Sequence, residues 1–364
     1  MDKPRIASVD ILRGLTIIAM ILVNTPGTWS AVYNPLLHAP WHGLTPTDLV
    51  FPFFLFIVGI SITFAYQNKS LDRSTLSKIS IRSLKLFGLG FFLHWFLPYA
   101  PFFKDLESVR ILGVLQRIAI VFFITAILAL ICNWKVLLTI AVSILLSYWI
   151  LMSYVPLPDG TLPSFERVAN NWALYVDSSI LKQHMWKEDY DPEGLLSSIP
   201  AVATAILGVL TGWFLTSKTQ EKVKQLIFTG LLLLLLGYLW HQIFPINKAL
   251  WTSSFVLVSA GWALICLSGI YYLTDVRKVA KGGLFKQVGM NAITIFFLSS
   301  FITKLFYMIK INGNQRIHSW LFDHLYKWPF LELKFSSLLY ALSVCLFYIL
   351  LGHIMYRNKI IIKV

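Results

Sequence analysis

The chain has 364 residues, of which 57% are hydrophobic and 13% are charged, and its mean hydropathy is +0.69. Ordinary soluble domains contain about 25% charged residues, so this composition excludes that class and indicates an integral membrane protein. The formal net charge of +14 does not indicate nucleic-acid binding, because the Lys and Arg residues form short clusters between apolar runs and no single basic face.

Ten segments are apolar enough to cross a bilayer, which requires about 20 predominantly apolar residues. Because a backbone in lipid must satisfy its own hydrogen bonds, these segments predict an all-α, polytopic membrane helix bundle with about ten transmembrane helices. No internal repeat or linker divides the sequence, so we expect residues 1–364 to form a single transmembrane domain. The predicted spans cover approximately residues 8–26, 47–67, 80–98, 108–131, 135–155, 195–216, 223–244, 249–273, 288–309 and 333–356.

The cationic clusters predict the orientation of the bundle. Most of them fall in alternate connections between the predicted spans, and the positive-inside rule assigns these connections to the cytoplasm. We therefore expect a multi-pass inner-membrane protein with both termini in the cytoplasm. The clusters lie at residues 3–13, 69–85, 218–224, 277–286 and 357–363.

Asp10 and Arg13 are three positions apart where the first predicted span leaves the cytoplasm, so they can pair on one helix face. Such a pair can fix the depth of the helix in the membrane, or it can contribute to binding a cytosolic anion. The sequence leaves both interpretations open, and both residues are candidate binding residues.

The first external loop, residues 25–46, has no Lys or Arg but contains His38, Trp41 and His42. Histidine titrates near neutral pH and can act as a general base or accept an acyl group. His38 is therefore a candidate catalytic residue, and Trp41 and His42 are candidate binding residues. A metal site is not expected, because Pro40 separates the histidines and no third ligand is apparent.

The second span begins with a capping sequence. Thr45 is the expected N-cap, Pro46 the first helical residue, and Asp48 lies in the first turn. Capping explains Thr45 and Pro46, but it does not explain two histidines and an acid at one membrane edge. Asp48 is therefore a further candidate catalytic residue.

Arg117, preceded by Gln116, lies near the external end of the fourth span. A buried Arg in a membrane is costly, so we expect Arg117 to face the bundle interior. Its partner is either an anionic ligand or one of two acids, Asp48 and Glu193. Gln116, Arg117 and Glu193 are all candidate binding residues.

Two further segments bring polar residues to the same external side. In the first, Asp191 is a possible N-cap of the sixth span and Glu193 lies in its expected first turn. In the second, Asn247 and Lys248 precede the eighth span. Asn247 and Lys248 are candidate binding residues.

Seven blocks of the sequence form a recognisable set: SVDILRG at 8–14, Val23 with Asn24, HAPWHGLTPTDLVFP at 38–52, GVLQR at 113–117, YDPEGLL at 190–196, PINKALWTSS at 245–254 and GMNA at 289–292. Together these blocks resemble the heparan-α-glucosaminide N-acetyltransferase family and its bacterial relatives. The likeness extends from the first predicted span to the ninth and so covers nearly the whole chain.

The resemblance implies a transmembrane acetyltransferase that takes its acetyl group from cytoplasmic acetyl-CoA and gives it to a glucosamine-type amine on the external side. It matches the family's active-site histidine to His38 and its functional asparagine to Asn24. His38 would then be a general base or a transient acetyl carrier, and Asn24 could donate a hydrogen bond to the carbonyl. Lysosomal members have an additional luminal domain, so the expected acceptor is a bacterial amino sugar and not heparan sulfate.

The expected partners are acetyl-CoA as co-substrate, the amino sugar and the lipid bilayer, with a homodimer as a further expectation and no metal or nucleic acid. Two other classes of protein remain open. A secondary transporter could use intramembrane acids and Arg117 for a small sugar or anion, although the inverted repeats typical of transporters are not seen. A non-catalytic sensor or scaffold is the third class.

Overall fold

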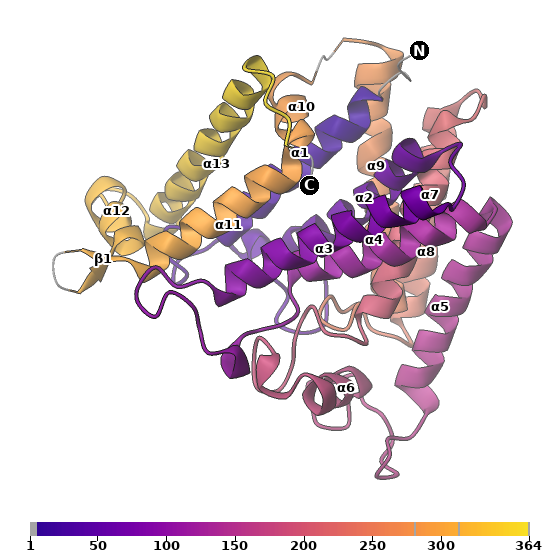
Figure 1. Cartoon of the computed structure of the whole chain (residues 1–364), viewed down its shortest axis with the longest axis horizontal. Helices are drawn as coiled ribbons and strands as arrows, with labels where there is room; N and C mark the ends of the chain where they lie inside the picture. Colours follow the sequence, from indigo (N-terminus) through magenta and orange to yellow (C-terminus); the bar gives the residue numbers. More distant parts are fainter. Residues whose placement is uncertain (1–5, 280–281, 312–313, 363–364) are drawn as a thin grey trace.

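The computed structural model describes residues 6–279, 282–311 and 314–362, and it is a bundle of helices (Figure 1). The prediction of an all-α membrane bundle is confirmed. The long and short helices are α1 (Ala7–Asn24), α2 (Val50–Tyr66), α3 (Arg73–Trp95), α4 (Val114–Ile131), α5 (Trp134–Tyr154), α6 (Trp172–Ile180), α7 (Ser198–Thr216), α8 (Lys222–His241), α9 (Ser253–Tyr271), α10 (Gly283–Met290), α11 (Ala292–Met308), α12 (Ile317–Leu325) and α13 (Leu333–Arg357).

Short elements connect these helices. Two strands pair antiparallel before α12, with Lys310 opposite Arg316. The remaining elements are the turns η1 (Asn34–Leu36), η2 (Pro46–Leu49), η3 (Leu106–Ser108) and η4 (Lys182–His184), the π-helical turn η5 (Tyr272–Val276), and the strands β1 (Lys310–Ile311) and β2 (Gln315–Arg316).

Within the described residues, eight helices are long and apolar enough to cross a membrane: α1, η2 with α2, α4, α5, α7, α8, α9 with η5, and α13. The pair α10 and α11 forms a ninth candidate, bent by 82° at Asn291. Asn291 binds the segment that follows α13, since its amide donates to the carbonyl of Ile360 at 3.0 Å and its side-chain oxygen accepts from the amide of Ile362 at 3.0 Å. The ninth span is therefore not the straight helix expected over 288–309.

The third predicted span, residues 80–98, corresponds to α3, which has 23 residues, begins earlier than expected, at Arg73, and is not among these eight helices. Its sequence is more charged than that of the other long helices because it also contains Lys78, Arg82 and Lys85. The guanidinium of Arg82 lies 4.8 Å from the ring centroid of Phe122 on α4, a cation–π contact that offsets part of the cost of burying this charge.

The start of α1, the end of α9 and the segment after α13 meet at one end of the bundle (Figure 1). Asp275 in η5 accepts hydrogen bonds from the backbone amides of Ala7 at 3.1 Å and Ser8 at 3.0 Å. A carboxylate at this position complements the positive end of the α1 dipole. Part of the predicted cytoplasmic charge, namely Lys3, Arg5, Lys281 and Lys363, lies outside the described residues.

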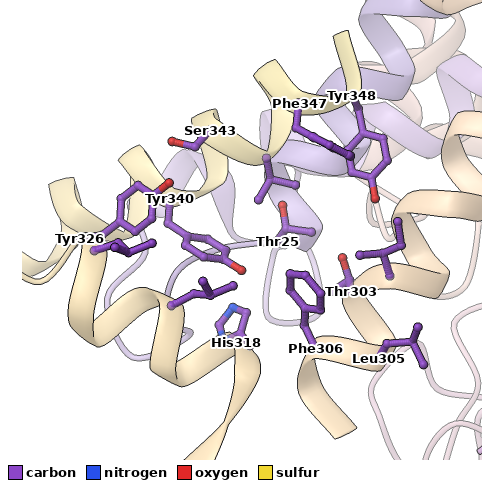
Figure 2. Close-up of a pocket in the computed structure, with 14 residues that line it drawn as sticks. Thr25, Thr303, Leu305, Phe306, His318, Tyr326, Tyr340, Ser343, Phe347 and Tyr348 are labelled. Atoms are coloured by element: carbon purple, nitrogen blue, oxygen red, sulfur yellow. The ribbon is translucent and has the colours of Figure 1, made fainter. Parts of the chain in front are cut away.

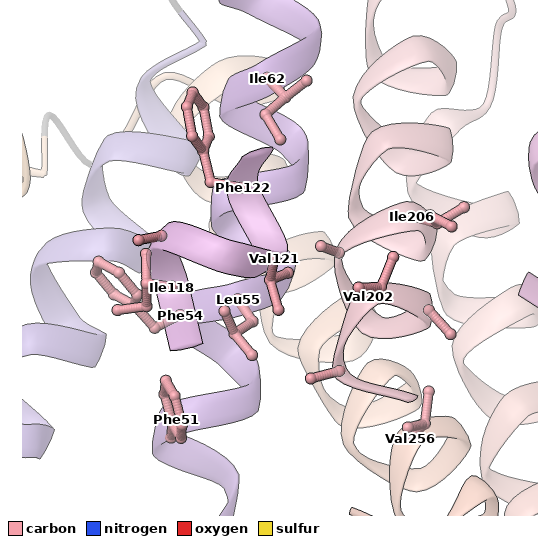
Figure 3. Packing of buried hydrophobic residues seen from close by; sticks show 14 of the residues in the cluster. Phe51, Phe54, Leu55, Ile62, Ile118, Val121, Phe122, Val202, Ile206 and Val256 are labelled. Atoms are coloured by element: carbon pink, nitrogen blue, oxygen red, sulfur yellow. The ribbon is translucent and has the colours of Figure 1, made fainter. Parts of the chain in front are cut away.

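The centre of the bundle is an apolar core contributed by several spans. Figure 3 shows side chains of α2, α4, α7 and α9 meeting between the helices. Leu55 and Val121 are fully buried there. The edge of the Phe51 ring packs against Trp251, with ring centroids 5.3 Å apart, which joins the start of α2 to the turn before α9.

Close contact between α2 and α7 depends on two glycines. A Cβ on Gly59 would lie 2.0 Å from the carbonyl oxygen of Ala205, and a Cβ on Gly208 would lie 2.0 Å from that of Phe56. Small residues at such crossings allow helix backbones in membranes to approach closely, because lipid provides no hydrophobic drive for association.

We expect Gly59→Ala to destabilise the protein by about 1–3 kcal/mol, because the added methyl group forces α2 and α7 apart. The control is Gly269→Ala in α9, where a Cβ has no neighbour within 4 Å and stability should stay the same or rise. Thermal unfolding in detergent measures both variants. Equal melting temperatures for the two would contradict the close crossing.

Candidate active site

His38, in the loop between α1 and α2, and Asp48, in the turn η2, form a pair at one end of the bundle. The Nδ1 atom of His38 lies 2.7 Å from Oδ1 of Asp48. The histidine side chain is 49% exposed, whereas the aspartate side chain is 1% exposed. The sequence predicted both residues as catalytic candidates, and the structure brings them into direct contact.

The carboxylate of Asp48 is held by the capping arrangement expected from the sequence. Its Oδ2 atom accepts hydrogen bonds from the backbone amides of Ala39 at 3.1 Å and Thr45 at 3.0 Å, and from the Thr45 hydroxyl at 2.9 Å. Thr45 is the N-cap of η2, and Pro46 is its first residue, as predicted. Three donors on Oδ2 leave Oδ1 for His38.

This geometry determines which nitrogen of His38 can react. A carboxylate accepts a hydrogen bond, so Nδ1 carries the proton that it donates to Asp48. The neutral ring then has its lone pair on Nε2. A histidine with this arrangement can accept a proton or an acyl group at Nε2.

Lys248 completes the group from a different part of the chain. Its Nζ atom lies 3.2 Å from Nδ1 and 3.3 Å from Nε2 of His38. Burial lowers the pKa of the Lys248 amine, and the carboxylates of Glu193 and Asp48 oppose this shift. An amine next to the reactive nitrogen of a histidine can contact a ligand bound there.

The turn that carries Lys248 is held by Asn247, which is fully buried. The side-chain oxygen of Asn247 accepts from the amide of Leu250 at 2.9 Å, and its backbone amide donates to the Thr252 hydroxyl at 3.1 Å. Its side-chain amide lies 3.3 Å from Nδ1 of His42. Asn247, predicted as a binding residue, thus supports the turn and also contacts the second histidine.

The loop of residues 25–46 is joined to the long segment before α7 by contacts of Trp41 and His42. The Nε2 atom of His42 lies 3.2 Å from a carboxylate oxygen of Glu166. The indole N–H of Trp41 donates to the carbonyl of Phe165 at 2.9 Å, and its ring packs edge-on against Tyr190 with centroids 5.6 Å apart. These contacts position the loop beside His38, and the sequence gave no signal for Glu166 as a partner.

Arg110 binds the two acids that precede α7. It donates to Asp191 at 2.9 Å through Nε and at 2.5 Å through Nη2, and to Glu193 at 2.6 Å. Burial alone would raise the pKa of Glu193, but Arg110 outweighs this effect and holds it below its ordinary value. The prediction that Asp191 caps the sixth span is wrong: α7 begins at Ser198, and Asp191 is committed to Arg110.

Arg117 is fully buried, as expected, but its predicted pairing with Asp48 or Glu193 is wrong. Its Nη2 atom donates to the carbonyl of Gly194 at 3.1 Å and to the Ser197 hydroxyl at 2.5 Å, and its guanidinium lies 5.1 Å from the ring centroid of Trp251. The acids are unavailable because Asp48 faces His38 and Glu193 faces Arg110.

Some polar atoms beside this arginine remain without partners. Among the described residues, the Nε and Nη1 atoms of Arg117 and the side-chain oxygen of Gln116 are buried and have no hydrogen bond. Unsatisfied buried groups of this kind are costly and are often completed by water or a ligand. Both residues therefore remain candidate binding residues.

Asp10 and Arg13 lie at the opposite end of α1 from Asn24, about 21 Å away along the helix at 1.5 Å per residue. The guanidinium of Arg13 lies 2.9 Å from Asp10 and donates to the Ser61 hydroxyl at 2.7 Å and to the carbonyl of Gly289 at 3.2 Å. These bonds join α1 to α2 and α10. The structure therefore does not bring this pair to His38.

Asn24 is the last residue of α1 and is exposed, and its side-chain amide has no hydrogen-bond partner among the described residues. The next residue, Thr25, lines a cavity of about 540 Å³ between α11, α12 and α13. Figure 2 shows His318 and Tyr340 directed toward this space. The cavity lining includes none of the residues that surround His38, so it is a separate feature at the same end of α1 as Asn24.

The catalytic family model of heparan-alpha-glucosaminide N-acetyltransferase matches residues 5–243, which include His38 and Asp48. The chain belongs to the heparan-alpha-glucosaminide N-acetyltransferase family. The human protein of this name is 29% identical over 423 residues, which cover 99% of this chain and 60% of the relative. The mouse protein of the same name is 30% identical over 352 residues, which cover 80% of this chain and 53% of the relative.

The chain thus spans about half to three-fifths of the length of these family members. Their names describe N-acetyltransferases, which favours this class of protein over the secondary transporter. The match also accounts for the sequence blocks around Asn24 and His38, because both lie within the matched residues.

A further acid near the site, Asp177 on α6, was not predicted from the sequence. Its side chain is buried, and its Oδ1 atom accepts from the backbone amide of Leu195 at 2.8 Å. A Cβ on Gly194 would lie 1.7 Å from the Asp177 carboxylate, so glycine is required for this approach. Burial, reinforced by the charge of Asp191, raises the pKa of Asp177 to about 6.

This shift predicts a pH-dependent cost to stability. The folded protein holds the proton of Asp177 more tightly than the unfolded chain, whose value is 3.8, so stability is lost as the pH rises through about 6. Asp177→Asn removes the charge but retains the acceptor, and it should stabilise the protein by on the order of 2 kcal/mol at pH 8 while changing little near pH 4. Melting curves in detergent from pH 4 to 8 measure this. Parallel curves for the two proteins would show that Asp177 does not titrate in this way.

Proposed function

We propose that this protein transfers an acetyl group from acetyl-CoA to the amine of a glucosamine-type sugar, with His38 as the central catalytic residue. The observation that carries the proposal is the His38–Asp48 pair, in which a buried carboxylate lies 2.7 Å from Nδ1 of an exposed histidine. Membership in an N-acetyltransferase family supports the reaction class.

The contacts suggest a role for each residue. Formation of an amide from a thioester requires a proton acceptor for the attacking amine and a donor for the developing charge on the carbonyl oxygen. His38 accepts the proton at Nε2 or carries the acetyl group there, and Asp48 holds the ring in the required tautomer. Asn24, with a side-chain amide that is not otherwise bonded, is the proposed donor to the carbonyl oxygen.

The surrounding residues are proposed to bind the two substrates. Lys248 can donate to an oxygen of a ligand at Nε2, while Arg117 and Gln116 offer the unpartnered polar atoms described above. Trp41 and His42, with Glu193 and Asn247, shape the loop around the acceptor sugar. Asp10 and Arg13 are proposed to join helices and not to bind a ligand, because the guanidinium is already committed to Ser61 and Gly289.

The proposed location is the bacterial inner membrane, with the termini in the cytoplasm and His38 on the external side. This orientation follows from the cationic clusters and the positive-inside rule. An external active site suits an acceptor that is a bacterial amino sugar, and the homodimer stays a prediction.

The central test measures transfer of radiolabel from acetyl-CoA to glucosamine by the purified protein in detergent. We expect His38→Ala to lower the rate by about 10²–10⁴-fold, because the proton acceptor or acetyl carrier is lost. His324→Ala is the matched control, since His324 is exposed on α12 and its Nδ1 contacts the carbonyl of Trp320 at 2.9 Å. Full activity of a folded His38→Ala protein would refute the assigned role.

We expect Asn24→Ala to lower kcat by about 10²–10³-fold with little change in KM, because a donor to the developing oxyanion acts mainly in the transition state. The control is Asn358→Ala at the exposed end of α13, where the amide donates to the carbonyl of Ile354 at 2.9 Å. Steady-state kinetics with varied glucosamine separates the two constants. A higher KM with unchanged kcat would assign Asn24 to sugar binding instead.

A further inference from the structure

Lys248 is an amine placed beside the nitrogen at which acetyl transfer is proposed to occur. Its Nζ atom lies 3.3 Å from Nε2 of His38. The turn that carries it is anchored by Asn247 and by Trp251, both fully buried, so the start of the lysine side chain is fixed.

Lys248 is not held away from His38 by an ion pair. Within the described ranges, no carboxylate oxygen lies within 4.0 Å of its Nζ atom, although Asp48 and Glu193 act on it from farther away. Lys224 differs in this respect, because its Nζ atom lies 2.6 Å from the Glu221 carboxylate. The amine of Lys248 instead lies beside the imidazole, at nearly equal distances from Nδ1 (3.2 Å) and Nε2 (3.3 Å) of His38.

We infer that Lys248 is a site of self-acetylation, which accepts the acetyl group at His38 when no acceptor sugar is present. This inference rests on the proposed function, since it requires acetyl-CoA and the reactivity of His38. The geometry carries it, because Nζ of Lys248 lies 3.3 Å from Nε2 of His38, so an acetyl group held at Nε2 would have its carbonyl carbon near this amine. An amine held this close to the acetyl group has a rate advantage over an amine that reacts from solution.

The chemistry balances without a further reagent. The C–S bond of the acetyl thioester breaks, a C–N bond forms at Nζ of Lys248, and the thiolate takes up a proton to leave as free CoA. The lysine ammonium loses two protons, one of which is taken up by the thiolate and the other released to water. His38 serves either by holding the acetyl group at Nε2 or by accepting the proton that leaves the amine.

The modification has a functional consequence. An acetylated Lys248 has no positive charge beside Asp48, and the added acetyl group occupies space next to Nε2 of His38. We therefore expect the protein to lose activity progressively when it is kept with acetyl-CoA and no acceptor. Glucosamine should protect it, because the sugar amine competes for the same acetyl group.

The experiment incubates the purified protein in detergent with acetyl-CoA alone and maps acetyl-lysine by peptide mass spectrometry. We expect acetylation of Lys248 at least 10-fold above that of Lys224, which reports uncatalysed acetylation because its side chain is 77% exposed. Addition of glucosamine should lower the signal at Lys248 but not at Lys224. Loss of transfer activity during the incubation should follow the same time course.

Two variants make the result decisive. His38→Ala should reduce acetylation of Lys248 to the level of Lys224, and Lys248→Arg should remove the modification and the progressive change in whatever activity that variant retains. Equal modification in wild type and His38→Ala would overturn the inference, since it would show simple chemical acetylation. An unmodified Lys248 in a preparation that acetylates glucosamine would overturn the inference but leave the proposed function intact, whereas transfer to neither amine would overturn both.

Discussion

The buried carboxylate of Asp48 is the constraint on which the active-site region depends. One of its oxygens accepts three hydrogen bonds from Ala39 and Thr45, and the other faces His38. An ionised carboxylate with 1% side-chain exposure is stable only if its lone pairs are satisfied. The loop of residues 25–46 must therefore fold back onto η2, which begins the second span, and this contact sets the position of His38.

A second set of charged residues joins loop segments at the same end of the bundle. Arg110 binds Asp191 and Glu193 and so attaches the segment before α7 to the segment before α4. Arg117 donates a hydrogen bond to the carbonyl of Gly194 in the same segment. Its guanidinium also lies over the ring of Trp251, next to the turn that carries Lys248. Residues far apart in sequence thus meet at this end of the bundle, because the buried Arg117 and the partly exposed Arg110 both take partners from residues 191–197.

Much of this could be predicted from the sequence. The apolar runs gave the helices, and the capping pattern of Thr45, Pro46 and Asp48 gave the start of the second span. The partners of the arginines could not be predicted, because periodicity and composition do not say which of several nearby acids an arginine meets. Arg117 was expected to bind either an acid or an anionic ligand, yet Arg110 takes both Asp191 and Glu193.

The errors have physical causes. Asp191 and Glu193 have the composition of a helix start, but hydrogen bonding to Arg110 keeps them in an irregular segment, and α7 begins five residues after Glu193. The bend at Asn291 depends on contacts with Ile360 and Ile362, about 70 positions later, which no local pattern contains. Asp177 was missed because it lies on the short helix α6, outside the predicted spans, and because its burial depends on the approach of Gly194 from another part of the chain.

The arrangement along α1 restricts how an acetyl donor can reach His38. Asp10 and Asn24 are separated by about 21 Å of helix, and the residues between them are packed into the core, with Ile17 and Ile21 almost fully buried. A donor bound near Asp10 would have to displace this packing for its thioester to arrive at His38.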